Sequence, residues 1–432
     1  MPQGCLGGAN CKGNVYGYKI QSIPRGRERT MRLAYLRTKS AKHRAEKRRT
    51  VKRKNIQGKG MALILAVTLA AALCGCGSNK DTEEPATEID FSNITNNASD
   101  DTAETEPQTE MVSTEAATEE EIPEGMYRSE ITNEWIDESL KDQRPVAIMV
   151  DNETKALPHY GLTEADVVYE LMNSTANGRI TRLMAIVKDW GKIEQFGSIR
   201  STRPTNVMLA AEWNAVLVHD GGPFYIDQYI AKDYSANFSG GFTRVNNGKA
   251  REYTEYVCTG DLDSRFANSK YSTEYNENYA GQHFVFSDSE VELTADRGAI
   301  DCTRIELPFP HNESMLEYNE ETGTYDYSEY GKAHTDPLHD NAQLTFKNLL
   351  IQDCTFAQLD ENGYMIYNVV GQGDNAYYIT NGKAIEVVWI KPSESEPTIF
   401  LDKQTGEQVE MNTGKTYIAI VPSDSWDDLV IQ

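Results

Sequence analysis

The residues with the clearest chemical potential are arginines and hydroxyls gathered at the start of an expected helix. A helix N-terminus offers unpaired N–H groups and partial positive charge, and guanidinium groups bind phosphate or carboxylate through paired hydrogen bonds. The candidate anion-binding residues are Arg179, Arg182, Arg200, Ser201, Thr202 and Arg203. The alternative is structural: Ser201 or Thr202 caps the helix, and each arginine pairs with a nearby carboxylate. The sequence leaves both interpretations open.

Two polar pairs, each following an apolar run, are candidates for lining a pocket. They are Asp151 with Asn152, and His219 with Asp220. Strand ends are common ligand positions in α/β folds, and a histidine beside an aspartate could act as an acid or a base. The glycines that follow Asp220 could instead serve only a turn. We therefore treat these four residues as pocket candidates and assign no catalytic residue.

The loop that contains His334, Asp336 and His339 has residue types that bind metals. Pro337 lies inside it, so no helix holds the two histidines on one face, and zinc would need further ligands. We expect an ordinary polar loop, no metal site and no cofactor. No Gly-x-Ser-x-Gly motif surrounds Ser198, so a serine nucleophile is not indicated either.

The charge distribution argues against nucleic acid as a partner. Residues 1–60 hold 17 basic and 2 acidic residues, whereas residues 76–432 hold 25 basic and 64 acidic residues. A body with so negative a net charge repels nucleic acid and anionic lipid. Cys258, Cys302 and Cys354 are the cysteines of the part expected to fold. Cys302 and Cys354 are expected as buried free thiols, although an oxidising exterior would permit a bridge between them.

An apolar run at residues 61–73 indicates a secretion signal. It is too short to span a bilayer as a helix, which needs roughly 20 residues, and it follows a strongly basic stretch. The run ends in Leu73-Cys74-Gly75-Cys76, which resembles the lipobox of bacterial lipoproteins. That resemblance implies that Cys76 is diacylated and becomes the mature N-terminus, and two acyl chains suffice for stable anchoring. We therefore expect an extracytoplasmic protein attached to the cell membrane.

Composition divides the chain into four segments. Residues 1–75 are the basic head with its signal. Residues 76–125 are an acidic tether with 15 acidic residues and one lysine between positions 77 and 124, and we expect disorder there because little apolar surface is available to offset chain entropy. The fold class expected for the rest is α+β: a mixed α/β domain at 126–283 followed by a β-rich domain at 284–432.

Hydrophobic runs locate the elements of these two domains. Continuous apolar runs predict buried strands, and a proline in the first turn favours a helix from Pro204. In the first domain we predict strands at 146–150, 167–172, 180–187 and 215–219, and helices at 204–213 and 224–234. In the second domain we predict strands at 325–330, 347–352, 376–380, 384–389 and 417–421. Asn362-Gly363 and Asn381-Gly382 predict hairpin turns.

Several motifs in the same order resemble the YerB family of bacterial lipoproteins. They lie at 144–152, 161–170, 180–186, 197–204, 218–222, 334–336, 347–351 and 371–391, so the resemblance covers roughly residues 135–425. It implies an extracytoplasmic protein with an N-terminal and a C-terminal family domain and brings no assigned activity. The family usually carries a Pro-His-Asn turn shortly after an arginine. Here Arg244 is followed by Arg251-Glu252-Tyr253 at that place.

The expected function is a membrane-tethered binding or scaffolding module at the bacterial cell envelope, with an envelope polymer or a protein as partner. The alternative is an enzyme that acts on phosphate-containing envelope polymers and grips a phosphate with the arginines. Such an enzyme needs an acid or base beside them, and Asp151, His219 and Asp220 are the candidates. The two functions differ in whether the arginines point into one cleft with these residues.

Overall fold

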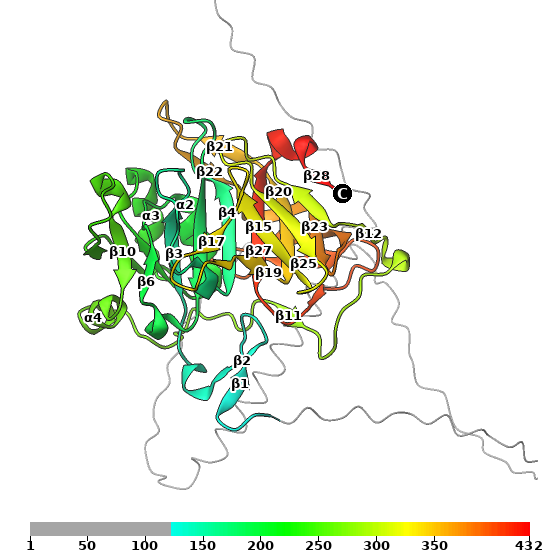
Figure 1. Cartoon of the computed structure of the whole chain (residues 1–432), viewed down its shortest axis with the longest axis horizontal. Helices are drawn as coiled ribbons and strands as arrows, with labels where there is room; N and C mark the ends of the chain where they lie inside the picture. Colours follow the sequence, from blue (N-terminus) through cyan, green and yellow to red (C-terminus); the bar gives the residue numbers. More distant parts are fainter. Residues whose placement is uncertain (1–121) are drawn as a thin grey trace, which may run out of the picture. The chain divides into compact units, whose positions relative to one another are not determined.

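The computed structural model describes residues 122–432, and most of their regular structure is β-strand (Figure 1). Eleven strands form a central sheet. In spatial order they are β12 (Ile300–Asp301), β24 (Lys383–Lys391), β23 (Gly371–Thr380), β20 (Asn348–Cys354), β27 (Thr416–Pro422), β4 (Val167–Met172), β5 (Thr181–Val187), β3 (Val146–Asp151), β7 (Val216–His219) and β8 (Asn237–Ser239), with β25 (Ile399–Asp402) beside β24. The predicted signal segment, Cys76 and the tether as far as residue 121 lie outside the described residues.

The central sheet contains strands from both predicted domains. Strands β4, β5, β3, β7 and β8 come from the N-terminal part, and the others come from the C-terminal part. The two sets join where β27 runs parallel to β4, from the pair Thr416–Val167 to the pair Ile420–Leu171. Figure 1 shows the cyan and green strands continuing into the yellow, orange and red ones. The two parts therefore share the hydrophobic cores on both faces of the sheet.

Smaller sheets and three short helices pack around this central sheet. A six-stranded sheet contains β16 (Lys332–Ala333), β15 (Thr324–Glu329), β14 (Met315–Asn319), β13 (Arg304–Glu306) and β28 (Val430–Ile431), with β19 (Thr345–Phe346) beside β15. The remaining strands are β1 (Met126–Arg128) with β2 (Trp135–Asp137), β6 (Gln195–Gly197) with β10 (Glu255–Cys258) and β9 (Thr243–Arg244), β11 (Val285–Phe286) with β26 (Glu410–Met411), β17 (Thr335–Asp336) with β18 (Ala342–Gln343), and β21 (Phe356–Gln358) with β22 (Met365–Tyr367). The α-helices of residues 122–432 are α2 (Pro204–Glu212), α3 (Asp227–Ile230) and α4 (Asp261–Ala267), and none has the length and apolar character needed to cross a bilayer.

The N-terminal part is β-rich rather than a mixed α/β domain, so this part of the predicted fold class is wrong. The helix predicted at 224–234 is a 3₁₀ turn, η4 (Phe224–Ile226), followed by the four-residue α3. Ile226 is the one buried side chain within these two elements. A short segment that buries so little gains too little packing energy to offset the cost of helix nucleation.

The long apolar runs form strands where the sequence predicted them. All six residues of β3 are buried, as are all seven of β5. Val146, Ile148 and Val150 pack into one core, whereas Ala147 and Met149 pack into the core on the opposite face of the sheet. A strand covered on both faces needs apolar residues at every position, which explains why these runs do not alternate with polar residues.

Both predicted hairpin turns are present, although they differ in length. Asn381 and Gly382 join β23 to β24 with φ of 50° and 71°, and Thr380 pairs with Lys383 across the turn. Two positive φ values in a two-residue loop match the Asn-Gly preference. Gly363 belongs to a longer loop between β21 and β22. Cys302 and Cys354 are buried free cysteines, as expected.

Candidate anion-binding site

Two neighbouring strand ends bring three of the predicted arginines together. Asp151 ends β3 and lies opposite Arg182 of β5 in the antiparallel pair. The loop between β6 and α2 passes these strand ends and carries Arg200 and Arg203. The Arg200 N–H donates to the carbonyl of Met149 at 3.0 Å, which fixes the loop against β3.

Arg182 and Arg203 share the hydroxyl group of Ser201. Arg182 Nη1 lies 2.9 Å from Ser201 Oγ, and Arg203 Nη1 lies 3.3 Å from the same atom. Further acceptors are the Ser201 carbonyl at 2.8 Å from Arg182 and the Thr202 carbonyl at 2.8 Å from Arg203. Asn173 completes the set, through Oδ1 to Arg182 and through its carbonyl to Arg203. Every one of these acceptors is neutral.

Neither Arg182 nor Arg203 has a carboxylate oxygen within 4.0 Å in residues 122–432, although each residue is only 7% exposed. Arg182 Nε is buried without a hydrogen bond, and the Nη2 atom of each guanidinium has no hydrogen-bond partner in this part of the chain. Burial lowers the pKa of Arg182 to about 10 and that of Arg203 to about 9, so both stay charged at neutral pH. Two buried cations without a carboxylate in contact are costly unless an anion joins them, although the charge of Asp151 offsets part of the cost at Arg182.

Two residues that sequence reasoning missed complete the surroundings of this pair. Asn173 follows β4 and supports both guanidinium groups. Tyr364, from the loop between β21 and β22, places its ring centroid 4.7 Å from the guanidinium carbon of Arg203. A cation over an aromatic face is attracted to the ring. Asn173 directly follows the strand predicted at 167–172, the signal that marked Asp151 and Asn152, whereas no local pattern marks Tyr364, which reaches the site only through the fold.

Arg200 behaves as the structural alternative predicted. Its Nε lies 2.8 Å from Asp151 Oδ2, and its Nη2 lies 2.6 Å from Glu252 Oε2. Two carboxylates compensate the charge of Arg200. Arg200 therefore positions the loop, and Asp151 is engaged in an ion pair with it.

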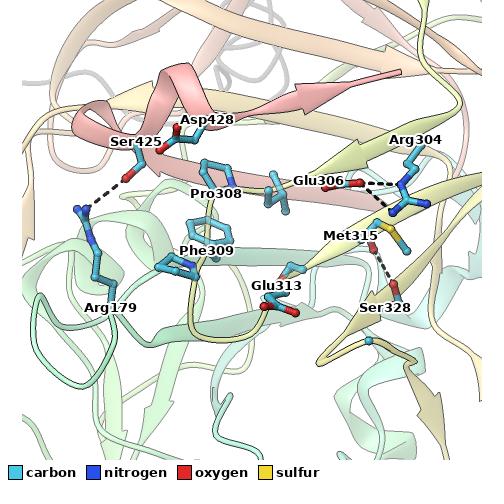
Figure 2. Close-up of a pocket in the computed structure, with 14 residues that line it drawn as sticks. Arg179, Arg304, Glu306, Pro308, Phe309, Glu313, Met315, Ser328, Ser425 and Asp428 are labelled. Atoms are coloured by element: carbon cyan, nitrogen blue, oxygen red, sulfur yellow. Dashed lines mark hydrogen bonds and ion pairs between the residues drawn. The ribbon is translucent and has the colours of Figure 1, made fainter.

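Arg179 lies apart from the other three arginines. Its Nη2 is 2.7 Å from Asp424 Oδ1, and its Nη1 donates to Ser425 Oγ at 3.2 Å. Figure 2 shows Arg179 directed at the segment of Ser425. Its positive φ of 63° places it in a turn before β5, which separates it from Arg182.

A pocket of roughly 630 Å³ lies beside Arg179 and is lined by Pro308 and Phe309 among others (Figure 2). Arg304 lines the same pocket and pairs with Glu306 at 2.8 Å. Both arginines of this pocket therefore have carboxylate partners, unlike Arg182 and Arg203.

The start of α2 differs from the predicted capping. Arg203 is the N-cap residue, and its N–H donates to Asn206 Oδ1 at 3.1 Å. Neither Ser201 nor Thr202 caps the helix, so that expectation is wrong. The hydroxyl of Ser201 is engaged by the two arginines, and that of Thr202 donates to the Arg203 carbonyl at 3.4 Å.

The predicted pocket residues His219 and Asp220 do not turn their side chains toward the arginine pair. His219 Nδ1 lies 2.8 Å from the Gly221 carbonyl, and its Nε2 lies 3.3 Å from Asn237 Oδ1. Asp220 Oδ2 lies 3.4 Å from Arg244 Nη2, which also pairs with the buried Glu255. Only the backbone of this loop adjoins the site, since the Asp220 N–H donates to the Arg200 carbonyl at 3.0 Å.

Asn152 belongs to a different polar network, centred on Glu170. The Glu170 side chain is fully buried and accepts hydrogen bonds from both parts of the chain. Its donors are Thr181 Oγ1 at 2.8 Å, Asn312 Nδ2 at 2.6 Å, Ser314 Oγ at 2.8 Å, Tyr417 OH at 2.6 Å, Tyr327 OH at 3.0 Å and Asn152 Nδ2 at 3.4 Å. Burial raises the pKa of this carboxyl, and several donors oppose that rise. The network holds the two parts together.

The two histidines of the 334–339 loop point to different partners. His334 Nδ1 lies 3.0 Å from Glu329 Oε1. His339 lies 3.3 Å from Asp336 and 3.2 Å from Glu164 and is more exposed. They therefore share no ligand set with each other.

Fold and site together define a β-rich protein of two intimately joined parts with a buried cationic site. Residues 131–272 match the N-terminal domain, and residues 305–418 the C-terminal domain, of a family described as "protein of unknown function (DUF3048)". The chain belongs to this family, the YerB family, and the resemblance seen in the sequence is confirmed.

One relative and one solved structure illustrate this relationship. The chain is 25% identical over 305 residues to the "Putative lipoprotein YerB" of Bacillus subtilis (strain 168). These matched residues cover 68% of this chain and 86% of the relative. A crystal structure of the YerB protein from Bacillus subtilis has a TM-score of 0.58 and 20% identity, over 71% of this chain and 99% of that chain. This second likeness shows a shared fold.

Proposed function

We propose that this protein is a membrane-anchored lipoprotein that binds an anionic group of an envelope component through Arg182 and Arg203. In this proposal Cys76 carries the lipid, the acidic segment at 76–125 spaces the folded part from the membrane, and the folded part lies on the extracytoplasmic side. The name of the Bacillus subtilis relative supports the lipoprotein assignment. The chemistry of the arginine pair supports the class of ligand, a phosphate or a carboxylate.

The observation that carries the proposal is the charge of this pair. Two guanidinium groups, each on a residue only 7% exposed, converge on one serine hydroxyl and have no carboxylate partner in residues 122–432. Guanidinium groups form their strongest hydrogen bonds with anions, and each charge-assisted hydrogen bond contributes about 1.5–3 kcal/mol. A bound anion would give the two guanidinium groups a hydrogen-bonded counter-charge, which no carboxylate of residues 122–432 provides within 4.0 Å.

Binding is favoured over catalysis because the candidate acids and bases are engaged elsewhere. Asp151 pairs with Arg200, both ring nitrogens of His219 have acceptors within 3.3 Å, and Asp220 pairs with Arg244. Acid–base catalysis needs a titrating group within hydrogen-bonding reach of the reacting atoms. His219 and Asp220 turn their side chains to other partners, and Asp151, whose charge also acts on Arg182, is held by Arg200.

The test is calorimetric titration of the purified chain with inorganic phosphate, pyrophosphate and a phosphate-containing teichoic acid fragment. We expect at least one of them to bind the wild type and to bind Arg203→Lys about 10-fold or more weakly. Lysine keeps the charge but loses the planar donor fork.

Arg179→Lys is the matched control for this experiment. Arg179 was part of the predicted cluster but pairs with Asp424 away from the site. Its substitution should leave the affinity unchanged. Equal affinities for wild type, Arg203→Lys and Arg182→Lys would contradict the proposal, as would the absence of binding by the wild type.

A further inference from the structure

We infer that His159, Glu329 and His334 form a binding site for one divalent transition-metal ion. The three side chains are buried, with residue exposures of 0%, 2% and 5%. One potential ligand atom from each lies within 4.8 Å of those from the other two. His159 comes from the segment after β3, Glu329 ends β15, and His334 lies between β16 and β17. This site is separate from the anion site of the proposed function.

The hydrogen bonds of the two imidazoles leave a lone pair on each that no donor satisfies. His159 Nε2 lies 2.6 Å from the Asp151 carbonyl oxygen, which can only accept, so Nε2 carries the proton and Nδ1 has the lone pair. His334 Nδ1 lies 3.0 Å from Glu329 Oε1, and when Glu329 is a carboxylate Nδ1 donates to it, which leaves the lone pair on Nε2. His159 Nδ1 and His334 Nε2 are both buried without a hydrogen-bond partner in residues 122–432.

These orphaned nitrogens are ligands of the kind that transition metals use. The ring centroids lie 5.0 Å apart, and neither ring donates to the other. In metal sites a ligating histidine usually donates its second N–H to a carbonyl or carboxylate, and the Asp151 carbonyl has this role for His159.

The donor set selects the class of ion. Two imidazole nitrogens and one carboxylate oxygen suit zinc and its neighbours in the first transition row rather than calcium or magnesium. Around tetrahedral zinc, ligand atoms lie roughly 3.3 Å apart, as follows from metal–ligand distances of about 2.0–2.1 Å. The observed spread of up to 4.8 Å therefore needs side-chain rotations to close around the ion, and in these the Glu329 carboxylate must leave His334 Nδ1 to become a ligand. A water molecule can supply the fourth ligand.

A metal at this position would link the two family domains. His159 lies within the segment 131–272, whereas Glu329 and His334 lie within 305–418. Because His159 bonds to Asp151, which pairs with Arg200, the ion would also hold the loop that carries the arginine pair. The sequence indicated no metal site because His159 is remote from the 334–339 loop along the chain.

The first experiment measures the metal content and stability of the wild-type chain. The full chain is produced in medium with added zinc, manganese and cobalt, and its metal is quantified by plasma mass spectrometry. We expect about one transition-metal ion per chain. After dialysis against a chelator, zinc at about 100 times its Kd should raise Tm by about 5 °C or more, and magnesium should not.

The second experiment compares variants. His159→Ala, His334→Ala and Glu329→Gln should each bind zinc at least 10-fold more weakly. His339→Ala is the matched control, because this histidine lies in the same loop but pairs with Asp336 and Glu164. A cobalt-loaded wild type should show visible d–d absorption that His334→Ala lacks. The inference is overturned if folded wild type, checked by circular dichroism, holds no transition metal under any of these conditions, or if His334→Ala keeps wild-type zinc affinity.

Discussion

At the scale of single residues, the buried charges of this protein differ in how they are compensated. Glu212 is fully buried and lies 2.8 Å from Lys391 Nζ, so a cation balances it. Glu170 has no such cation but accepts several hydrogen bonds from hydroxyl and amide groups. Arg182 and Arg203 have neutral acceptors only. Arg144 is also buried and donates to a neutral acceptor, the Asn214 carbonyl, so what distinguishes Arg182 and Arg203 is that two such cations meet at one serine hydroxyl.

The Glu212–Lys391 pair provides a prediction on stability. Both side chains are 0% exposed, and Thr398 Oγ1 and Tyr169 OH also donate to Glu212. Glu212→Ala should lower the free energy of unfolding by about 3–5 kcal/mol, because it leaves Lys391 charged and buried. Chemical denaturation measures the loss.

Glu386→Ala is the control for that measurement. Its partner Lys403 lies 2.7 Å away, but the two side chains are 27% and 55% exposed, so the expected loss is about 1 kcal/mol or less. Despite burial, Lys391 and His283 lower the pKa of Glu212 well below its usual 4.5. The contribution of the carboxylate is therefore complete above about pH 4.5 and declines as the pH falls further. Losses of similar size in both variants would contradict this assignment.

The candidate site was partly predictable at this scale. Arg182, Arg200 and Arg203 converge as expected because a strand end and the loop before a helix are local features. The sequence could not show that Arg179 lies apart from the other three arginines, because its partner Asp424 is far along the chain. Nor could it identify Tyr364 as the ring beside Arg203. Which arginines are compensated depends on such long-range neighbours, which local residue types do not reveal.

At the scale of elements, the strands were more predictable than the helices. Runs such as 146–150 and 167–172 are apolar at every position because both faces of the sheet are covered, and this composition is legible in the sequence. The segment 224–234 looked helical but buries too little to sustain a long helix. The pairing of β27 with β4 was not predictable, because parallel pairing leaves no local turn signal.

The loop between β21 and β22 provides a prediction that connects an element to the site. Gly363 has a φ of +82°, and a Cβ atom there would lie 2.7 Å from Ala176 N and 2.8 Å from Ser174 Oγ. Gly363→Ala should therefore push apart Tyr364 and the segment after Asn173, and weaken phosphate binding several-fold. It should also cost about 1 kcal/mol or more of stability. Calorimetric titration and denaturation measure the two effects.

Gly406→Ala is the control for Gly363→Ala, because it introduces backbone strain without displacing residues of the site. Gly406 also has a positive φ, +73°, but a Cβ atom there meets nothing within 4 Å. This variant should show a stability loss of about 1 kcal/mol with unchanged phosphate affinity. If both variants bind phosphate like the wild type, the loop has no role in holding the site.

At the scale of the whole molecule, two sequence segments share one sheet and one buried polar network. The sheet crosses the boundary expected at 283/284, and Glu170 accepts hydrogen bonds from Thr181 on one side and Tyr417 on the other. Composition distinguished the two segments but could not show that they pack as one unit. The arginine pair lies in the N-terminal segment, and Tyr364 approaches it from the C-terminal one.

The anchoring proposal makes a prediction for the intact chain in a bacterial host. Cys76→Ala should move the protein from the membrane fraction to the soluble fraction or leave an unprocessed precursor, because the diacylated thiol is lost. Cys74→Ala is the control and should fractionate like the wild type. Membrane fractionation with mass measurement of the N-terminus reads out both. Normal processing of Cys76→Ala would contradict lipidation at this residue.

The central claim is that Arg182 and Arg203 bind an anion, and anomalous diffraction tests it most directly. Crystals of the protein are soaked with selenate, a heavier analogue of sulfate and phosphate, and the selenium positions are located. We expect a selenium peak with oxygen atoms about 3 Å from the Nη2 atoms of both arginines. The peak should be absent in Arg203→Lys and present in Arg179→Lys. The claim is contradicted if ordered, solvent-accessible sites elsewhere take up selenate while the arginine pair remains bonded only to Ser201, Thr202 and Asn173.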